Sequence, residues 1–78
     1  MITAHVRFDP ARGLLVGTFD DGFIIESADP RELAERMYAH GARHGQVSMP
    51  DWREGDIAPT GGDKIAFHAR LNQLGRTA

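Results

Sequence analysis

Apolar and polar residues alternate at the start of the chain with the period of two that is typical of a β-strand. In ITAHVRF, residues 2–8, the even-numbered positions are apolar and the odd-numbered positions are polar or charged. One face of such a strand is expected to be buried and the other exposed. The segment DPARG follows, and its Pro10 and Gly13 predict a hairpin connection to a second strand, LLVGTF, at residues 14–19.

A second turn and a third strand are predicted directly afterwards. DDG at residues 20–22 is suited to a tight turn, because Gly22 can adopt a positive φ without steric cost. FIIES, residues 23–27, has the pattern of a strand with Phe23 and Ile25 facing inward. The three strands are expected to form an antiparallel meander, whose apolar face needs a cover.

The cover is predicted to be a helix at residues 30–40. Asp29 is a suitable N-cap, Pro30 is favoured at the first helical position, and Glu32 has the spacing of a capping-box partner. Gly41 is suited to end the helix in the left-handed conformation. The expected apolar stripe consists of Leu33, Ala34, Met37 and Tyr38.

The segment after this helix predicts a short strand and a loop. QVSMP, residues 46–50, has the composition of a short fourth strand that ends at Pro50. Residues 51–62 are rich in glycine, proline and charged residues, which is typical of a loop, and they include the single tryptophan of the chain.

The tail at residues 63–74 shows two competing periods. A strand would account for the alternation of Ile65, Phe67, Ala69 and Leu71. A helix would account for the spacing of Phe67, Leu71 and Leu74. We predict a helix, because Thr60 with Asp63 can cap it, most of its residues favour helices, and Gly75 can end it.

These elements predict a single α+β domain at residues 1–78, with the order βββαβα and two helices on one face of a small antiparallel sheet. A chain of 78 residues can bury only one modest core, and it has no cysteine for a disulfide or a thiolate metal site. Residues 1–19 lack the apolar run of a signal peptide, and no segment has the roughly 20 apolar residues of a membrane span. We therefore expect a cytoplasmic protein with no membrane contact.

The net charge of −2 conceals a segregation of charge along the chain. Residues 20–35 sum to −5, whereas residues 36–50 and 64–78 sum to +2 and +3. Eight of the nine cations are arginine, which favours forked pairing with carboxylates and phosphates. This balance is not typical of a nucleic-acid binder, so we expect no direct contact with nucleic acid.

The carboxylates between positions 20 and 35 are the first candidates for a binding site, and two interpretations are open. In one, they cap the helix and form the pairs Glu32–Arg36 and Arg31–Glu35, each four residues apart. In the other, the turn and the start of the helix are neighbours and form a negative patch that meets a basic partner. The residues predicted to bind the partner there are Asp20, Asp21, Glu26, Glu32 and Glu35.

Trp52 and Arg53 are the second candidates, in the loop at residues 51–62. Trp52 either folds back to close the edge of the core or anchors a partner. Tryptophan and arginine are the residue types that most often dominate the energy of an interface. We therefore include both residues among those predicted to bind the partner.

No other set of residues dictates a chemistry. His40 and His44 have the spacing of metal ligands, but glycines interrupt their helix. TGGDK at residues 60–64 lacks the spacing of a phosphate-binding loop, and Ser27 and Ser48 lie outside any nucleophile motif. We expect no metal, no cofactor and no enzymatic activity.

The chain resembles the small phage and mobile-element proteins that inactivate CRISPR systems, the anti-CRISPR proteins. The resemblance lies in size, cysteine-free composition, a strand meander packed by helices, and segregated charge. It is strongest to inhibitors of type I effector complexes, with the type I-C inhibitors as the preferred class. It implies a stoichiometric inhibitor, monomeric or weakly dimeric, in the cytoplasm of a bacterial host.

Such an inhibitor would bind a crRNA-guided surveillance complex and block target DNA binding or nuclease recruitment. A groove built to hold DNA is positively charged, so the resemblance makes residues 20–35 the natural contact. The low net charge of the chain leaves a mixed interface that uses Trp52 and arginines as an equal alternative.

An antitoxin-like or regulatory module is the alternative function. The opening of strands and then a helix, residues 1–40, is similar to HicB-type antitoxin domains, which bind a toxin and, through an appended domain, operator DNA. This resemblance implies protein binding and leaves contact with nucleic acid open, because no helix-turn-helix or ribbon arm is predicted in the chain.

Overall fold

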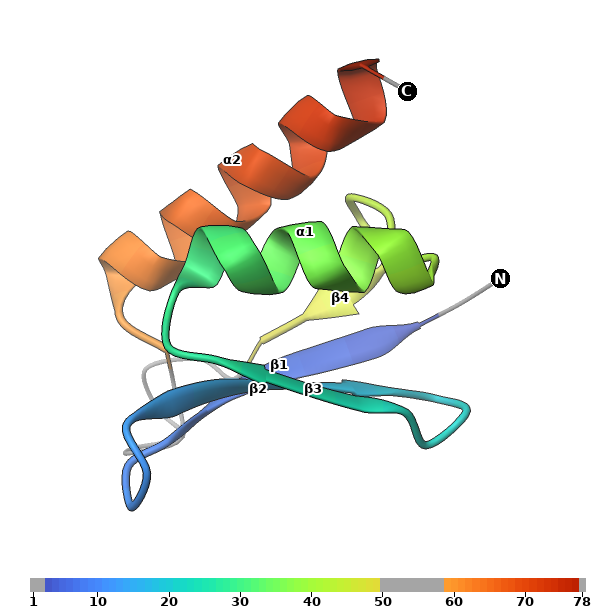
Figure 1. Cartoon of the computed structure of the whole chain (residues 1–78). Helices are drawn as coiled ribbons and strands as arrows, with labels where there is room; N and C mark the ends of the chain where they lie inside the picture. Colours follow the sequence, from blue (N-terminus) through green and yellow to red (C-terminus); the bar gives the residue numbers. More distant parts are fainter. Residues whose placement is uncertain (1–2, 50–58, 78) are drawn as a thin grey trace.

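The computed structural model describes residues 3–49 and 59–77, and its elements follow the predicted order βββαβα (Figure 1). The strands are β1 (Ala4–Asp9), β2 (Leu14–Phe19), β3 (Ile24–Ser27) and β4 (Val47–Ser48), and the helices are α1 (Pro30–His40) and α2 (Gly61–Thr77). The predicted α+β class is confirmed. No helix in these two ranges is both long and apolar enough to cross a membrane.

The four strands form a mixed sheet in the order β3-β2-β1-β4. β2 is antiparallel to both β1 and β3, whereas β4 is parallel to β1. The prediction of a wholly antiparallel sheet was therefore wrong at the fourth strand. The reason is the crossover through α1, which carries the chain back along the sheet so that the next strand runs in the direction of β1 (Figure 1).

One face of the sheet is covered by the helices. The register pairs Ala4 with Phe19 and Val6 with Gly17 across β1 and β2, and Gly17 with Ile25 across β2 and β3. All five positions are buried, as the period of two predicts for strands with one covered face.

Phe23 was predicted to face inward, but it is 46% exposed. It lies in the turn before β3, which begins only at Ile24. Its ring stacks on His40, with ring centroids 4.1 Å apart. Because α1 ends at His40, no further turn of that helix covers the outer side of Phe23.

The ends of α1 follow local chemistry. The Asp29 side chain accepts a hydrogen bond from the Arg31 backbone amide at 2.9 Å, as an N-cap does. The expected reciprocal bond from Glu32 does not form, because the Asp29 amide donates to Ser27 Oγ at 3.1 Å. At the other end, Gly41 adopts φ 117° and ends the helix as predicted.

The tail is a helix, as predicted, but α2 is longer than residues 63–74 at both ends. Thr60 acts as the N-cap, since its Oγ1 accepts a hydrogen bond from the Asp63 amide at 3.1 Å, so the helix begins at Gly61. Gly75 does not end it, and α2 continues to Thr77. Glycine adopts helical angles as well as left-handed ones, so a glycine near a predicted end only permits termination.

Both helices lie on the same side of the sheet, and α2 packs on α1 (Figure 1). Phe67 and Leu71 of α2 are fully buried, together with Leu33 and Met37 of α1 and Val6 of β1. They belong to one core cluster, so α2 completes the core that the meander and α1 begin. Tyr38, predicted in the apolar stripe of α1, packs partly buried against this cluster.

Candidate interaction surface

The carboxylates of the β2–β3 turn lie beside the C-terminal end of α1. Asp21 accepts a hydrogen bond from the Phe23 amide at 2.9 Å, and its Oδ2 lies 3.1 Å from His40 Nε2. Asp20 accepts a hydrogen bond from Thr3 Oγ1 at 3.3 Å. The pKa of Asp21 is lowered, first by the bond from the Phe23 amide and then by the bond with His40. The turn is thereby tied to the last residue of α1.

Glu26 and Glu32 are held by arginines of the chain. The Glu26 carboxylate forms an ion pair with the Arg12 guanidinium, and its backbone oxygen accepts a hydrogen bond from Arg36 Nη1 at 3.3 Å. Arg36 Nη1 also lies 3.6 Å from Glu32 Oε1, which confirms the predicted Glu32–Arg36 pair. Arg36 therefore links the edge strand β3 to α1.

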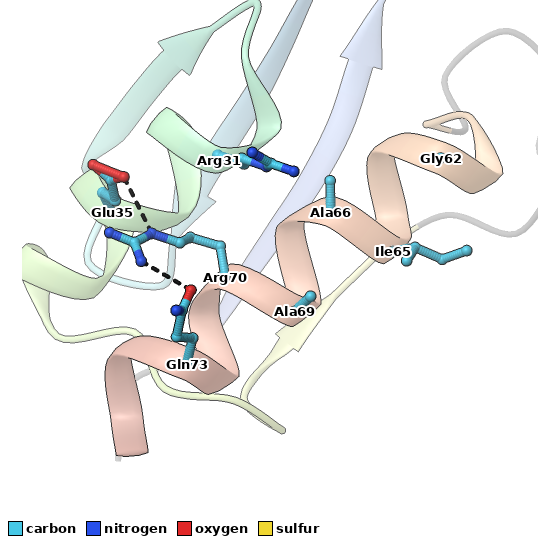
Figure 2. A pocket seen from close by; sticks show the side chains of 8 residues that line it. All are labelled: Arg31, Glu35, Gly62, Ile65, Ala66, Ala69, Arg70 and Gln73. Carbon is cyan, nitrogen blue, oxygen red and sulfur yellow. Dashed lines mark hydrogen bonds and ion pairs between the residues drawn. The ribbon is translucent and has the colours of Figure 1, made fainter. Parts of the chain in front are cut away.

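Glu35 pairs across the two helices instead of along its own. Its Oε2 lies 3.2 Å from Arg70 Nε of α2, so the predicted Arg31–Glu35 pair was wrong. Arg70 also donates from Nη1 to Gln73 Oε1 at 3.0 Å (Figure 2). Tertiary packing gave Glu35 a partner 35 residues away, which spacing along one helix could not reveal.

The predicted negative patch is not a single surface. The turn with Asp20 and Asp21 meets the C-terminal end of α1, whereas Glu32 lies in its first turn. Eleven helical residues separate these ends by about 16 Å. The prediction that the turn and the start of the helix are neighbours was therefore wrong, because α1 runs antiparallel to β3. Trp52 and Arg53 lie outside the described residues.

A groove of about 680 Å³ lies between α1 and α2 (Figure 2). Arg31 and Glu35 line it from α1, and Gly62, Ile65, Ala66, Ala69, Arg70 and Gln73 line it from α2. Ile65 is 73% exposed. An apolar strip on α2 is formed by Ile65, Ala66 and Ala69, and charged and polar side chains border it. This arrangement resembles the core and rim of a protein interface.

Sequence reasoning missed this groove, although a signal was present. Once residues 63–74 are assigned to a helix with Phe67, Leu71 and Leu74 inward, Ile65 falls on the opposite face. Two residues of helix correspond to a rotation of about 200°. An isoleucine that lies outside the apolar stripe of its own helix is a candidate surface residue.

Two histidines meet elsewhere, where α2 passes the segment after α1. The ring centroids of His44 and His68 are 5.9 Å apart in an edge-to-face arrangement. Burial lowers the pKa of His68, and the charges of His44 and Lys64 lower it further. No group of three or more potential metal ligands occurs among residues 3–49 and 59–77. His40, which has the spacing of a metal ligand relative to His44 in the sequence, contacts Asp21 and Phe23 instead.

Comparison with known proteins found no matching family, no matching curated protein and no matching solved structure. The function is therefore inferred from the residues of the chain itself.

Proposed function

We propose that this chain acts by binding another protein, without converting a substrate. The observation that carries the proposal is the groove between α1 and α2, where Ile65 is exposed beside an inter-helix ion pair. Exposed apolar surface with a polar border favours protein association, and arginine is enriched where binding energy concentrates.

The specific form of the proposal is a stoichiometric inhibitor of a CRISPR-Cas effector complex, with type I-C complexes as the first class to test. The size, the composition and the meander packed by helices support it through the resemblance to anti-CRISPR proteins. By occupying a site on the complex, the chain would block target DNA binding or nuclease recruitment.

The ion pairs favour a mixed contact over imitation of DNA by charge. Glu26, Glu32 and Glu35 each lie beside an arginine of the chain, and Asp21 lies beside His40. A paired carboxylate projects a weaker field than a free one, so these residues serve to orient a partner more than to attract it.

The test is co-purification with a type I-C effector complex, followed by a gel shift of that complex with target DNA. We expect the wild-type chain to bind and to reduce the DNA shift at equimolar concentration. Ile65→Asp should weaken inhibition at least tenfold. The matched control is Ile24→Asp, since Ile24 is also exposed, at 56%, but lies on β3 away from the groove.

The outcomes distinguish protein binding through the groove from inhibition of a CRISPR complex. Failure of the wild-type chain to co-purify with the effector complex, together with an unaltered DNA shift at excess chain, would reject the CRISPR inhibitor. Equal loss of inhibition in both aspartate variants would indicate that the groove has no special part in binding.

An antitoxin-like function is the alternative, and the observed order of elements supports it. β1, β2, β3 and α1 follow one another as in the strands-then-helix opening of HicB-type domains. Binding of the isolated chain to duplex DNA with a steep dependence on salt would favour this regulatory function. Absence of DNA binding at 50 mM salt, together with effector binding, would reject it.

A further inference from the structure

We propose that the groove between α1 and α2 binds a segment of a partner protein that carries an aliphatic side chain next to a carboxylate. The inference rests on the proposed protein-binding function and specifies the chemistry of the partner. It does not depend on the partner being a CRISPR effector.

The aliphatic requirement follows from Ile65. It is 73% exposed, and its neighbours along the groove are the small residues Ala66 and Ala69. These side chains leave room for a partner side chain to lie against Ile65, and burying such surface drives association.

The carboxylate requirement follows from Arg31. With Glu35 paired to Arg70, the Arg31 guanidinium has no ion pair among residues 3–49 and 59–77. Figure 2 shows the Arg31 side chain extending from α1 in the direction of Ala66 on α2. An arginine beside an apolar surface is suited to bidentate pairing with a carboxylate.

The charge of the described lining residues also favours an acidic partner. Among the described residues that line it, Arg31 and Arg70 contribute two positive charges and Glu35 contributes one negative charge. Gly62 lies in the first turn of α2, where Asp63 offsets the partial positive charge of the helix dipole, so the positive charge of this lining comes from the arginines. The described lining of the groove therefore carries a net charge of +1 in a protein whose net charge is −2, which gives it complementarity to an acidic segment.

The same features disfavour two other occupants. A second copy of the chain, docked groove to groove about a two-fold axis, would place two linings of the same net positive charge against each other. Nucleic acid would need several phosphate contacts, whereas one of the two arginines is already bonded to Glu35 and Gln73. None of the described residues that line the groove is aromatic, so none of them offers a ring on which a base could stack.

The experiment is a selection of displayed random 12-residue peptides on the immobilised full chain, with removal of peptides that also bind Ile65→Asp. We expect the surviving peptides to share an aliphatic residue with Asp or Glu within four positions. A consensus without a carboxylate, or no peptide that depends on Ile65, would overturn the proposal.

The selected peptide is then titrated against two charge reversals. Arg31→Glu should weaken binding at least tenfold, because it replaces attraction by repulsion. Arg7→Glu changes the net charge equally at an exposed position of β1, outside the groove, and should change affinity less than twofold. Equal effects would show that only net charge matters and would overturn the proposed site.

Two further arms identify the occupant. Sedimentation of the full chain at 10 to 500 µM should show no dimer whose formation depends on Ile65, with Ile65→Asp as the comparison. A labelled 20-nucleotide DNA should not displace the bound peptide. Either contrary result would overturn the proposal. If the peptides behave as expected while no effector complex binds, only the CRISPR assignment falls.

Discussion

Gly17 shows how a single residue sets the distance between the sheet and α1. A Cβ atom built on Gly17 would lie 2.5 Å from Sδ of Met37, and Met37 is fully buried. Gly17 therefore provides space for a side chain of the opposite element, and it is not needed here for a turn or a positive φ. Sequence alone marks it only as a glycine inside a strand.

We expect Gly17→Ala to lower the free energy of unfolding by about 1–3 kcal/mol, because it overpacks the interface between β2 and α1. Urea denaturation measures the change. In a Met37→Ala background, Gly17→Ala should lower the free energy of unfolding by less, since the Met37 atoms that would clash with the new methyl group are absent. Equal costs in both backgrounds would contradict the proposed clash.

His68 gives the stability of the protein a dependence on pH. Its pKa is lowered from 6.5 by burial and by the nearby charges of His44 and Lys64, so the folded state disfavours the protonated ring. Between the unfolded value and the lower folded value, the unfolded chain binds more protons. Stability therefore falls as pH drops below about 6.5 and levels off below the folded pKa.

We expect His68→Gln to reduce the loss of stability between pH 7.5 and pH 5, measured by urea denaturation at several pH values. His5→Gln is the control, since His5 is exposed on the face of β1 opposite to the buried Ala4 and Val6 and should leave the effect of His68 in place. If His68→Gln leaves the pH profile of stability unchanged, the loss of stability at low pH comes from other groups.

At the scale of elements, the ends of the two helices were predicted with different success. Gly41 ends α1 with a left-handed φ and hydrogen bonds from the Gly41 and Ala42 amides to the last turn. Gly75 lies inside α2 with nothing within 4 Å of a Cβ position. The difference is that the chain turns toward β4 after Gly41, whereas α2 continues in the same direction past Gly75.

We expect Gly75→Ala to stabilise the protein by about 0.5–1 kcal/mol, because alanine favours the helix and meets open space. Thermal denaturation followed by circular dichroism measures the gain. Gly41→Ala is the contrasting variant and should destabilise, since φ at that position is 117°. A loss of stability in Gly75→Ala would mean that the helix ends before this residue in solution.

At the scale of the whole molecule, α2 is part of the core and not an appendage. Phe67 and Leu71 are fully buried in the cluster that also holds Leu33 and Met37. A small domain has a total stability of about 5–15 kcal/mol, so the loss of one such residue is a large fraction of the whole. The groove, which depends on α2 lying against α1, is expected to be lost with it.

We expect Phe67→Ala to lower the free energy of unfolding by about 3–5 kcal/mol. Phe23→Ala should cost about 1 kcal/mol, because Phe23 is half exposed and loses mainly its contact with His40. Urea denaturation of the two variants provides the comparison. Similar costs would show that α2 packs less tightly on the core than its burial indicates.

Much of the local structure was predictable, and little of the candidate site was. The strands, the cap at Asp29 and the end at Gly41 follow from residues within a few positions of each other. The partner of Glu35 is Arg70, and the position of Asp21 depends on His40, so both contacts join segments distant in sequence. Spacing along one element cannot predict such contacts.

By itself, the sequence determined the order βββαβα, because hydrophobic period, caps and turn residues act over short distances. Only the tertiary structure decided that β4 runs parallel to β1, that the carboxylates divide between both ends of α1, and that Ile65 borders a positive groove. These features depend on which faces of the helices meet the sheet and each other. That choice is made by burial of the whole core, which no local pattern encodes.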